Sequence, residues 1–398
     1  MAQARTVLIS GAGIGGPTLA YWLKRAGFTP TLVEHAPRLR AGGYVIDFWG
    51  LGYDIAGRMG LEPAIQRAGY RIEELRVVNG KGRRVAGFGT SVFTELTGGR
   101  YVTVARSELS RLIFETGADG AETIFGDEIV SLDERADHVA VRLEHGGERR
   151  FDLVVGADGL HSAVRRLSFG PQAQYEKHLG YVVAAFQVEG YPHRDEDIYV
   201  MYCEPGRMLG RVTLRENKTL FLFVFAHEAA AHRPDLAAQK ALLRATFGDG
   251  QWECPAILDA LDAAGDVYFD RVSQIRMPRW SSGRVALIGD AAYCVSLLAG
   301  QGTALAMLGA YVLAGELATA KGDYTSAFRN YETKLRGYIE GKQKGAERFA
   351  TAFAPRTRMG LWFRNQVLNV ASLPGLAKLM VGRDIVETMK LPEYDWPG

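Results

Sequence analysis

"RTVLISGAGIGGPTLAYWLKRAGFTPTLVE", residues 5–34, reads as a strand, a glycine turn, a helix and a second strand. The run from residue 5 to residue 10 is rich in β-forming residues, and the residues after Pro17 have helical apolar spacing. Pro17 suits the first turn of a helix, where its missing N–H costs nothing, and Gly27 suits the end of the helix. The stretch therefore predicts a βαβ unit and an α/β fold class.

The glycines of this unit have a spacing with a specific physical use. Gly11, Gly13 and Gly16 form G-x-G-x-x-G, and Glu34 closes the second strand. The first glycine makes the tight turn, the second lets the backbone approach a pyrophosphate, and the third lets helix and strand pack closely. The helix N-terminus presents N–H groups to the phosphates, and the acid accepts a ribose hydroxyl. We expect FAD or NAD rather than NADP here, with these contacts from the turn: Gly11, Ala12, Gly13, Ile14, Gly15 and Gly16.

A second stretch is marked by the absence of charge. After Asp290, residues 291–315 carry no Asp, Glu, Lys or Arg, although these make up 23% of the chain. The run is long enough for a membrane span, but "AGQG" at 299–302 would interrupt it and no basic cluster flanks it. We therefore predict a buried helix that starts near Gly302, with its N–H dipole available to a reduced flavin anion.

Two carboxylates are expected at strand ends near the same nucleotide. "DLVVGADGLHSAVR" (152–165) places Asp158 and Gly159 after an apolar strand, and "VALIG" (285–289) precedes Asp290. Each carboxylate could accept from a sugar or ribityl hydroxyl. A solvated cap is the alternative interpretation of such an Asp.

The order of elements predicts a discontinuous first domain with a second domain inserted into it. We expect a Rossmann-like FAD-binding domain from residues 1–70, 100–172 and 278–350. Residues 71–99 and 173–277 should form an antiparallel-sheet substrate-binding domain, and residues 351–398 a C-terminal helical lid.

Composition excludes several classes of protein. The 398 residues are 47% hydrophobic with a net charge of +2, and no basic run suggests nucleic acid. Three cysteines, Cys203, Cys254 and Cys294, are too few and too distant for a disulfide framework or a metal cluster. A cytoplasmic protein without a metal site or stable membrane insertion is expected, as a monomer or weak dimer.

Taken together, the glycine turn with Glu34, the Asp158-Gly159 stretch and "GDAA…AGQG" resemble the class A flavoprotein monooxygenases, the aromatic hydroxylases of the para-hydroxybenzoate hydroxylase fold. The resemblance covers most of residues 1–345. "GGYVID", "GDAAYC" and "AYVLAGEL" are similar to the tetracycline destructases and their relatives, and the segment after Pro355 stands where those enzymes carry a C-terminal helix over the substrate pocket.

The resemblance implies roles for further residues. Arg106 would contact FAD, Asp47 would lie near the flavin, and Asp290 would hold the ribityl–pyrophosphate region. The Asp158-Gly159 stretch with Arg165 would face both FAD and the transient NADPH or NADH. The remaining implied cofactor contacts are His35, Arg40, Leu109, Gly289, Gly300, Gln301 and Gly302. The chain departs from the class at Tyr293, where His is frequent, and at Leu297, where Pro is frequent, which puts substrate identity in doubt.

The implied activity is an NAD(P)H-driven, FAD-dependent hydroxylation of an aromatic or enolic substrate by O2, through a flavin C4a-hydroperoxide. A tetracycline-type polyketide and a small phenol or heteroaromatic acid are both candidate substrates. No catalytic acid or base is assigned, because the cofactor carries the chemistry. Candidate substrate contacts are Arg207, Phe221 and Leu297, with a surface arginine and core packing as the alternatives for the first two. A FAD oxidase or dehydrogenase without oxygen insertion, and a flavin-binding regulator, are the alternative functions.

Overall fold

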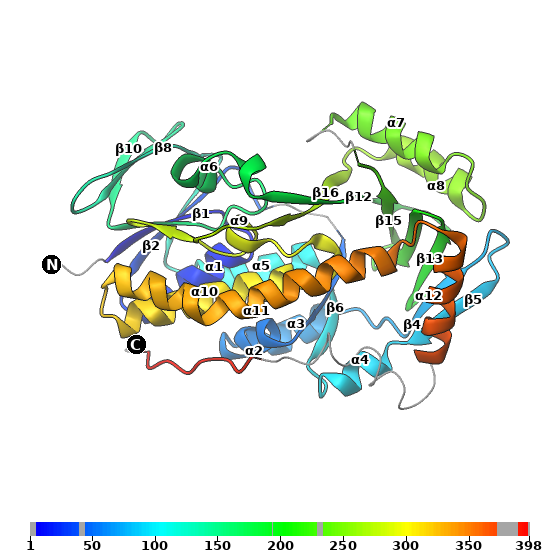
Figure 1. The fold of residues 1–398 in the computed structure, drawn as a ribbon, viewed down its shortest axis with the longest axis horizontal. Helices are drawn as coiled ribbons and strands as arrows, with labels where there is room; N and C mark the ends of the chain where they lie inside the picture. Colours follow the sequence, from blue (N-terminus) through cyan, green and yellow to red (C-terminus); the bar gives the residue numbers. More distant parts are fainter. Residues whose placement is uncertain (1–4, 40–43, 193, 229–233, 372–388, 397–398) are drawn as a thin grey trace.

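The computed structural model describes residues 5–39, 44–192, 194–228, 234–371 and 389–396, and of residues 349–352 and 371 only the backbone. Arg40, one of the expected cofactor contacts, lies outside the described residues. The chain folds around two large sheets that are set end to end along the long axis of the molecule (Figure 1).

The first sheet has six strands in the order β17-β18-β11-β1-β2-β7. All neighbours are parallel except β17 and β18. Apart from the edge strand β7, its parallel strands are mostly buried, as expected for a sheet covered on both faces. The strands are β1 (Thr6–Ser10), β2 (Thr29–Glu34), β7 (Glu122–Phe125), β11 (Leu153–Gly156), β17 (Ser281–Ser282) and β18 (Val285–Leu287).

Helices cover this sheet, and the apolar stretch after Asp290 provides the central one. α10 (Gly302–Thr319) starts where the sequence predicts a helix, and it packs against α1, α2 and α11. It is long and apolar enough to cross a membrane, but most of it is buried inside the fold. The other helices here are α1 (Gly15–Arg25), α2 (Leu51–Arg58), α3 (Glu62–Ala68), α5 (Arg106–Gly117), α6 (Ala163–Phe169), α9 (Asp290–Tyr293) and α11 (Tyr324–Phe353).

The second sheet has seven strands in the order β16-β12-β15-β14-β13-β4-β5, antiparallel except for β13 and β4. Residues 74–89 and 176–275 contribute its strands, so two distant parts of the sequence build one sheet. These strands are β4 (Glu74–Val78), β5 (Arg84–Gly89), β12 (Glu176–Glu189), β13 (Ile198–Glu204), β14 (Arg207–Thr213), β15 (Lys218–Ala226) and β16 (Tyr268–Ile275).

The two faces of this second sheet have different neighbours. Helices α7 (Leu236–Phe247) and α8 (Cys254–Ala263) cover what we call the outer face, where Phe221, Phe223 and Phe225 are buried. On the opposite, inner face, Tyr199, Met201 and Leu222 point toward the rest of the molecule. Alternate residues of a strand point to opposite faces, so neighbouring positions in β15 serve different purposes.

Smaller elements connect and extend the two sheets. A two-stranded ribbon of β3 (Val45–Trp49) and β6 (Tyr101–Ala105) lies between them, and a three-stranded sheet lies beside the first. The remaining elements are α4 (Ser91–Leu96), β8 (Ile129–Glu134), β9 (Val139–Leu143), β10 (Glu148–Phe151), η1 (Gln172–Gln174) and η2 (Leu297–Ala299).

The C-terminal region consists of a helix and an extended tail. α12 (Arg358–Ala371) packs against β5 and β13 at the end of the second sheet (Figure 1). Residues 389–396 are neither helix nor strand, and they bind the opposite part of the molecule. Tyr394 donates to the buried carboxylate of Glu316 (2.7 Å), and Trp396 packs on Trp22 of α1. The tail therefore closes the helical layer over α10. Residues 372–388 of the expected C-terminal lid lie outside the described residues.

Candidate functional site

The glycine turn between β1 and α1 has the shape that its spacing predicts. Gly11 has a φ of 104°, and a Cβ at Gly16 would lie 1.9 Å from the carbonyl oxygen of Gly11, so both positions require glycine. A Cβ at Gly13 would meet nothing within 4 Å. The second glycine therefore faces open space, on the side where a phosphate would approach the backbone.

The first turn of α1 and the end of β2 meet at this open space. No side chain caps α1 at Ile14, so its first N–H groups are available to an anion. Glu34 accepts the backbone N–H groups of Ala12 (2.8 Å) and Ala36 (3.0 Å), which fixes its carboxylate beside the turn. The next residue, His35, is well exposed and lies 3.4 Å from Glu128. Glu34 has acceptor capacity left for a ribose hydroxyl.

Asp158 lies at the carboxyl end of β11, next to the end of β1. Its Oδ2 accepts the backbone N–H of Val164 (3.1 Å), but its Oδ1 is buried with no partner among the described residues. Burial raises the pKa of this carboxyl group. A buried oxygen without a partner is costly, so a donor from a bound molecule is the natural complement. Gly159 has a φ of 78° with open space beside it.

Arg165 has a different position from the one that the resemblance implies. Its side chain is 0% exposed, and its guanidinium donates to the carbonyl oxygens of Leu160 (2.6 Å) and Ala291 (2.8 Å). Burial lowers its pKa. Arg165 thus ties the loop after β11 to the loop after β18 from inside the protein, and it does not reach the open side of the turn.

Asp290 brings the third strand end to the same place. Gly289, with a φ of 60°, turns the chain after β18, and a Cβ at Gly302 would lie 3.6 Å from Asp290 Oδ1. The carboxylate thus lies at the N-terminus of α10. Burial raises its pKa, and the charge of Arg106 at the start of α5 opposes that shift. The "GDAA" and "AGQG" stretches are therefore parts of one site.

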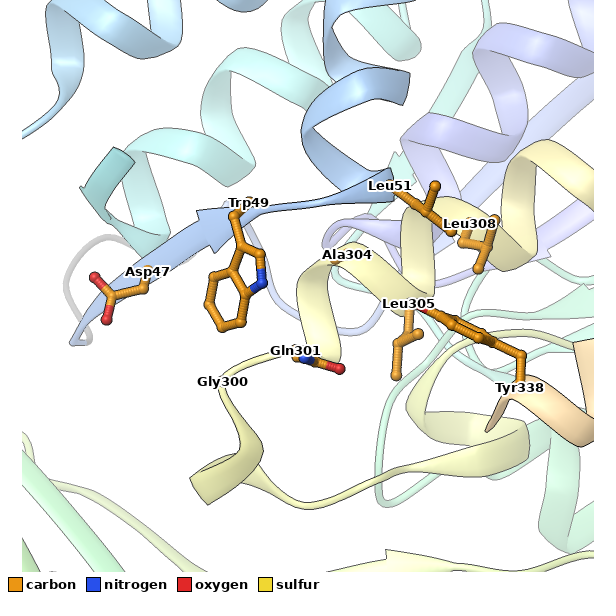
Figure 2. Close-up of a pocket in the computed structure, with 9 residues that line it drawn as sticks. All are labelled: Asp47, Trp49, Leu51, Gly300, Gln301, Ala304, Leu305, Leu308 and Tyr338. Carbon is orange, nitrogen blue, oxygen red and sulfur yellow. The ribbon is translucent and has the colours of Figure 1, made fainter. Parts of the chain in front are cut away.

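A pocket continues from this point between β3, α10 and α11 (Figure 2). Asp47 and Trp49 of β3 lie on one side, and Gly300 and Gln301 face them from the other. Its remaining lining residues are Leu51, Ala304, Leu305, Leu308 and Tyr338. Gly300 adopts the left-handed conformation at a φ of 65°, which lets the chain turn sharply into α10.

Asp47 is held in place by two neighbouring hydroxyl groups. Tyr101 and Thr103 on β6 both donate to its Oδ1, each at 2.6 Å. The Asp47 side chain is exposed at the open side of its strand, and partial desolvation by the protein around it raises the pKa of its carboxyl group. Because both donors use Oδ1, the second oxygen is available to a bound molecule. Leu109, in contrast, lies on the inward side of α5 and is fully buried in the core.

The inner face of the second sheet forms the far side of this region. Leu297 of η2 packs with Met201 and Met208, and the rings of Tyr44 and Tyr268 meet edge-on with their centroids 5.3 Å apart. The Tyr199 hydroxyl is buried without a partner among the described residues, and desolvation together with the charge of Asp47 raises its pKa. The sequence shows which residues alternate along these strands, but it does not show which set faces the pocket.

Two expected substrate contacts are not brought to this region. Arg207 lies on the outer face, where it binds Glu204 (2.7 Å) and Asp249 (2.6 Å) and lies over the ring of Phe247. Phe221 is 0% exposed in the core beneath α7 and α8. Core packing and ion pairing account for both side chains. Tyr293 is also turned inward, since its hydroxyl accepts that of Tyr331 at 3.2 Å.

The three strand ends define the site. β1, β11 and β18 are adjacent and parallel, so the glycine turn, Asp158 and Asp290 meet at one edge of the sheet, where α/β proteins bind nucleotides. Open backbone at Gly13, an uncapped helix N-terminus, a fixed Glu34 and an unpartnered Asp158 oxygen fit the pyrophosphate and sugar hydroxyls of FAD. The fold and this site are those of an FAD-dependent oxidoreductase.

Comparison with known proteins gives the family. Residues 4–327 match the FAD binding domain family. The chain is 36% identical over 358 residues to a flavin-dependent monooxygenase of Legionella longbeachae, covering 86% of this chain and 88% of that one. It belongs to the FAD-binding family of class A flavoprotein monooxygenases.

Solved structures agree with this assignment over nearly the whole chain. The tetracycline destructase Tet(55) superposes with a TM-score of 0.85 at 31% identity, covering 99% of this chain and 100% of that one. Klebsiella pneumoniae HpxO, solved with FAD and uric acid, superposes with a TM-score of 0.79 at 25% identity, with 96% of each chain covered. The fold is thus shared with a tetracycline destructase and with a protein whose structure holds FAD and uric acid.

Proposed function

We propose that this monooxygenase uses NADPH or NADH and O2 to hydroxylate a polycyclic aromatic or enolic compound of the tetracycline type. The net reaction consumes one O2, one reduced nicotinamide and one proton, and it yields hydroxylated product, oxidised nicotinamide and water. The observation that carries the proposal is the apolar and aromatic inner face opposite Asp47 and Gln301. Similarity to Tet(55) supports the same substrate class.

The residues that would hold FAD come from three loops. The turn from Gly11 to Gly16 would bind the pyrophosphate, Glu34 a ribose hydroxyl, and Asp158 and Asp290 the sugar and ribityl hydroxyls. Arg106, exposed at the start of α5, would neutralise phosphate charge. When bound, FAD takes up hydride from the nicotinamide and activates O2 for transfer of one oxygen atom.

The protein's own contribution is to position the substrate and exclude water. Tyr44, Tyr199, Tyr268 and Leu297 offer flat or apolar surface against a fused ring system. The second oxygen of Asp47 and the buried Tyr199 hydroxyl are the polar groups that could orient a phenol or enol hydroxyl. Gly300 and Gln301 lie at the N-terminus of α10, where backbone N–H groups favour developing negative charge.

The setting of the enzyme follows from its cysteines. Cys203, Cys254 and Cys294 are free thiols, and two of them are buried. The free thiols support our proposal that the enzyme works in a reducing cytoplasm. We further propose that it is a monomer or weak dimer.

The decisive experiment is mass spectrometry of products formed under 18O2. Purified FAD-loaded enzyme is incubated with NADPH or NADH and either tetracycline or a panel of small phenols, and nicotinamide oxidation is followed in parallel. A gain of one 18O atom in tetracycline, coupled to NADPH loss, is the expected result. Turnover of the phenols alone would refute the substrate class. Nicotinamide oxidation that yields hydrogen peroxide and no oxygenated product with any substrate would indicate an oxidase, and the absence of any substrate-stimulated oxidation a regulator.

A further inference from the structure

The outward face of α12 carries an unusual apolar surface. Met359, Trp362, Phe363 and Val370 are 78%, 63%, 65% and 41% exposed. Their spacing places them on one side of the helix. Among the described residues, only two other large hydrophobic side chains are at least 36% exposed, and one of them, Val85 (39%), lies beside α12 on β5. Large apolar side chains gathered on one surface mark an interaction site.

α12 is fixed so that this surface points away from the molecule. On its inward side, Arg364 donates to the carbonyl oxygen of Phe353 (3.1 Å), and Leu368 packs with the inner face of the second sheet. On the flank, the Asn369 amide donates to the carbonyl oxygen of Val85 (3.2 Å), which ties α12 to β5. The exposed side chains are therefore presented by an anchored helix at the end of the molecule (Figure 1).

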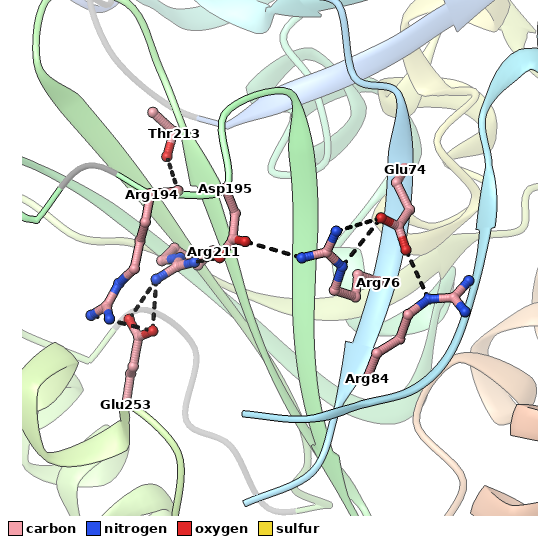
Figure 3. A network of polar contacts seen from close by, with 8 residues as sticks. All are labelled: Glu74, Arg76, Arg84, Arg194, Asp195, Arg211, Thr213 and Glu253. Carbon is pink, nitrogen blue, oxygen red and sulfur yellow. Dashed lines mark hydrogen bonds and ion pairs between the residues drawn. The ribbon is translucent and has the colours of Figure 1, made fainter. Parts of the chain in front are cut away.

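The charge around this surface is positive. Residues 353–371, which include α12, contain no Asp or Glu, and the β4–β5 hairpin that α12 contacts carries Lys81, Arg83 and Arg84. Figure 3 shows Arg84 bound to Glu74, within a larger network of ion pairs on the same sheet. Lys81, Arg83 and Arg358 are exposed and have no acidic partner among the described residues. A chain with a net charge of only +2 thus has one such cation, Arg358, on α12 itself and two, Lys81 and Arg83, on the hairpin whose strand β5 contacts α12.

We propose that α12 and the β4–β5 hairpin dock the enzyme onto an anionic phospholipid bilayer. Aromatic and aliphatic side chains on one helix face enter the interface between headgroups and acyl chains, and neighbouring cations bind the anionic headgroups. In a symmetric dimer formed through this surface, the unpaired cations of both copies would lie close together and repel. Anionic lipid headgroups would neutralise the same cations, so the charge favours a bilayer over a second copy. Docking goes beyond the proposed reaction. It would bring the substrate side of the molecule near the membrane, because Leu368 of α12 shares an apolar cluster with Leu297.

The test measures co-sedimentation of the FAD-loaded enzyme with phosphatidylcholine vesicles, with or without 30 mol% phosphatidylglycerol. We expect binding only to the anionic vesicles, and its loss in high salt. Trp362→Ser combined with Phe363→Ser should weaken binding at least tenfold. Lys81→Gln combined with Arg83→Gln should weaken it about 30-fold, since each cation near the surface contributes about fivefold. Leu236→Ser, at the exposed apolar position on α7, should bind like the unmodified enzyme.

Several results would overturn the proposal. Absence of binding to anionic vesicles, or equal binding by all variants, would refute it directly. A salt-resistant dimer that dissociates in the Trp362→Ser, Phe363→Ser variant would assign the surface to a second copy. Acrylamide quenching of tryptophan fluorescence in the free enzyme gives a further check. The fluorescence lost in Trp362→Phe should be quenched by acrylamide. If that fluorescence is instead shielded from acrylamide, another part of the chain covers the surface. Flavin absorbance and circular dichroism verify that each variant is folded and loaded.

Discussion

Replacing Gly13 with alanine tests whether glycine is required at this position for FAD binding or for folding. A Cβ at Gly13 meets no protein atom within 4 Å, whereas one at Gly16 would lie 1.9 Å from the Gly11 carbonyl oxygen. The backbone at Gly13 also lies outside the positive-φ region, so alanine can adopt its conformation without strain. The protein by itself therefore tolerates a methyl group at residue 13, and only a ligand that touches the backbone there would exclude it.

The sizes of the two effects can be estimated from these contacts. Without FAD, Gly13→Ala should stabilise the protein by about 0.4–1 kcal/mol, because alanine restricts the unfolded chain. With FAD, a methyl group that displaces the pyrophosphate from a backbone N–H removes a charged hydrogen bond of about 1.5–3 kcal/mol. The dissociation constant should rise by about 10- to 150-fold. Gly16→Ala should instead destabilise the apoprotein by about 1–3 kcal/mol through overpacking.

The assay combines thermal unfolding of the apoprotein with FAD titration, followed by quenching of flavin fluorescence. Gly341→Ala in α11 is the matched control, because its Cβ also meets nothing within 4 Å and lies away from the turn. It should leave FAD affinity unchanged. If Gly13→Ala bound FAD as tightly as the control does, the pyrophosphate would not lie at this turn and the assignment of the site would fail.

Four further predictions concern other parts of the molecule. Asp290→Ala should lower FAD occupancy, measured by the ratio of flavin to protein absorbance after purification. Tyr394→Phe should reduce the free energy of unfolding by about 1–3 kcal/mol in urea, because the tail then leaves a buried carboxylate with one hydrogen bond fewer. Desolvation raises the pKa of Asp47 above its ordinary value of 3.8. Between the unfolded and the folded pKa, the folded state binds more protons than the unfolded state, so stability falls as pH rises. Asp47→Asn should remove that decline in apoprotein unfolding measured from pH 4 to 8. Leu222→Ala should raise KM for the substrate with little loss of stability, whereas Phe221→Ala should cost about 3–5 kcal/mol of stability.

Each of these expectations has a clear contrary result. A fully yellow Asp290→Ala variant with unchanged affinity would remove that carboxylate from the cofactor site. Unchanged stability of Tyr394→Phe would mean that the tail adds nothing to the fold. Parallel pH profiles for Asp47→Asn and the unmodified protein would show that Asp47 titrates normally. If Phe221→Ala raised KM and Leu222→Ala lowered stability, Phe221 and not Leu222 would face the substrate.

Local sequence was sufficient wherever the chemistry depends on neighbours along the chain. The glycine turn, the strand that ends at Glu34 and the buried helix that starts at Gly302 were all predictable. Each of these features requires particular residue types at nearby positions in the sequence. A positive φ and a close backbone approach require glycine, and a buried helix requires uncharged residues. The family resemblance rests on the same residues and is confirmed by the comparisons.

Other features depended on contacts between distant parts of the chain. Arg165 follows Asp158 by seven residues, yet it is a buried brace because the loop after β18 supplies the carbonyl oxygen of Ala291. The role of residues 389–396 is equally invisible in sequence, since Tyr394 finds its partner 78 positions earlier, at Glu316. No local pattern encodes a partner that only folding brings near.

The sequence by itself determined the class of cofactor, the alternation of side chains along each strand and the central helix. The tertiary structure alone decided which alternate set faces the site, and it placed Leu222 on the inner face and Phe221 beneath α7 and α8. The physical reason is that a strand has two equivalent sides until something packs on one of them. In this chain α7 and α8 cover the outer face, so only the inner face is turned toward the rest of the molecule.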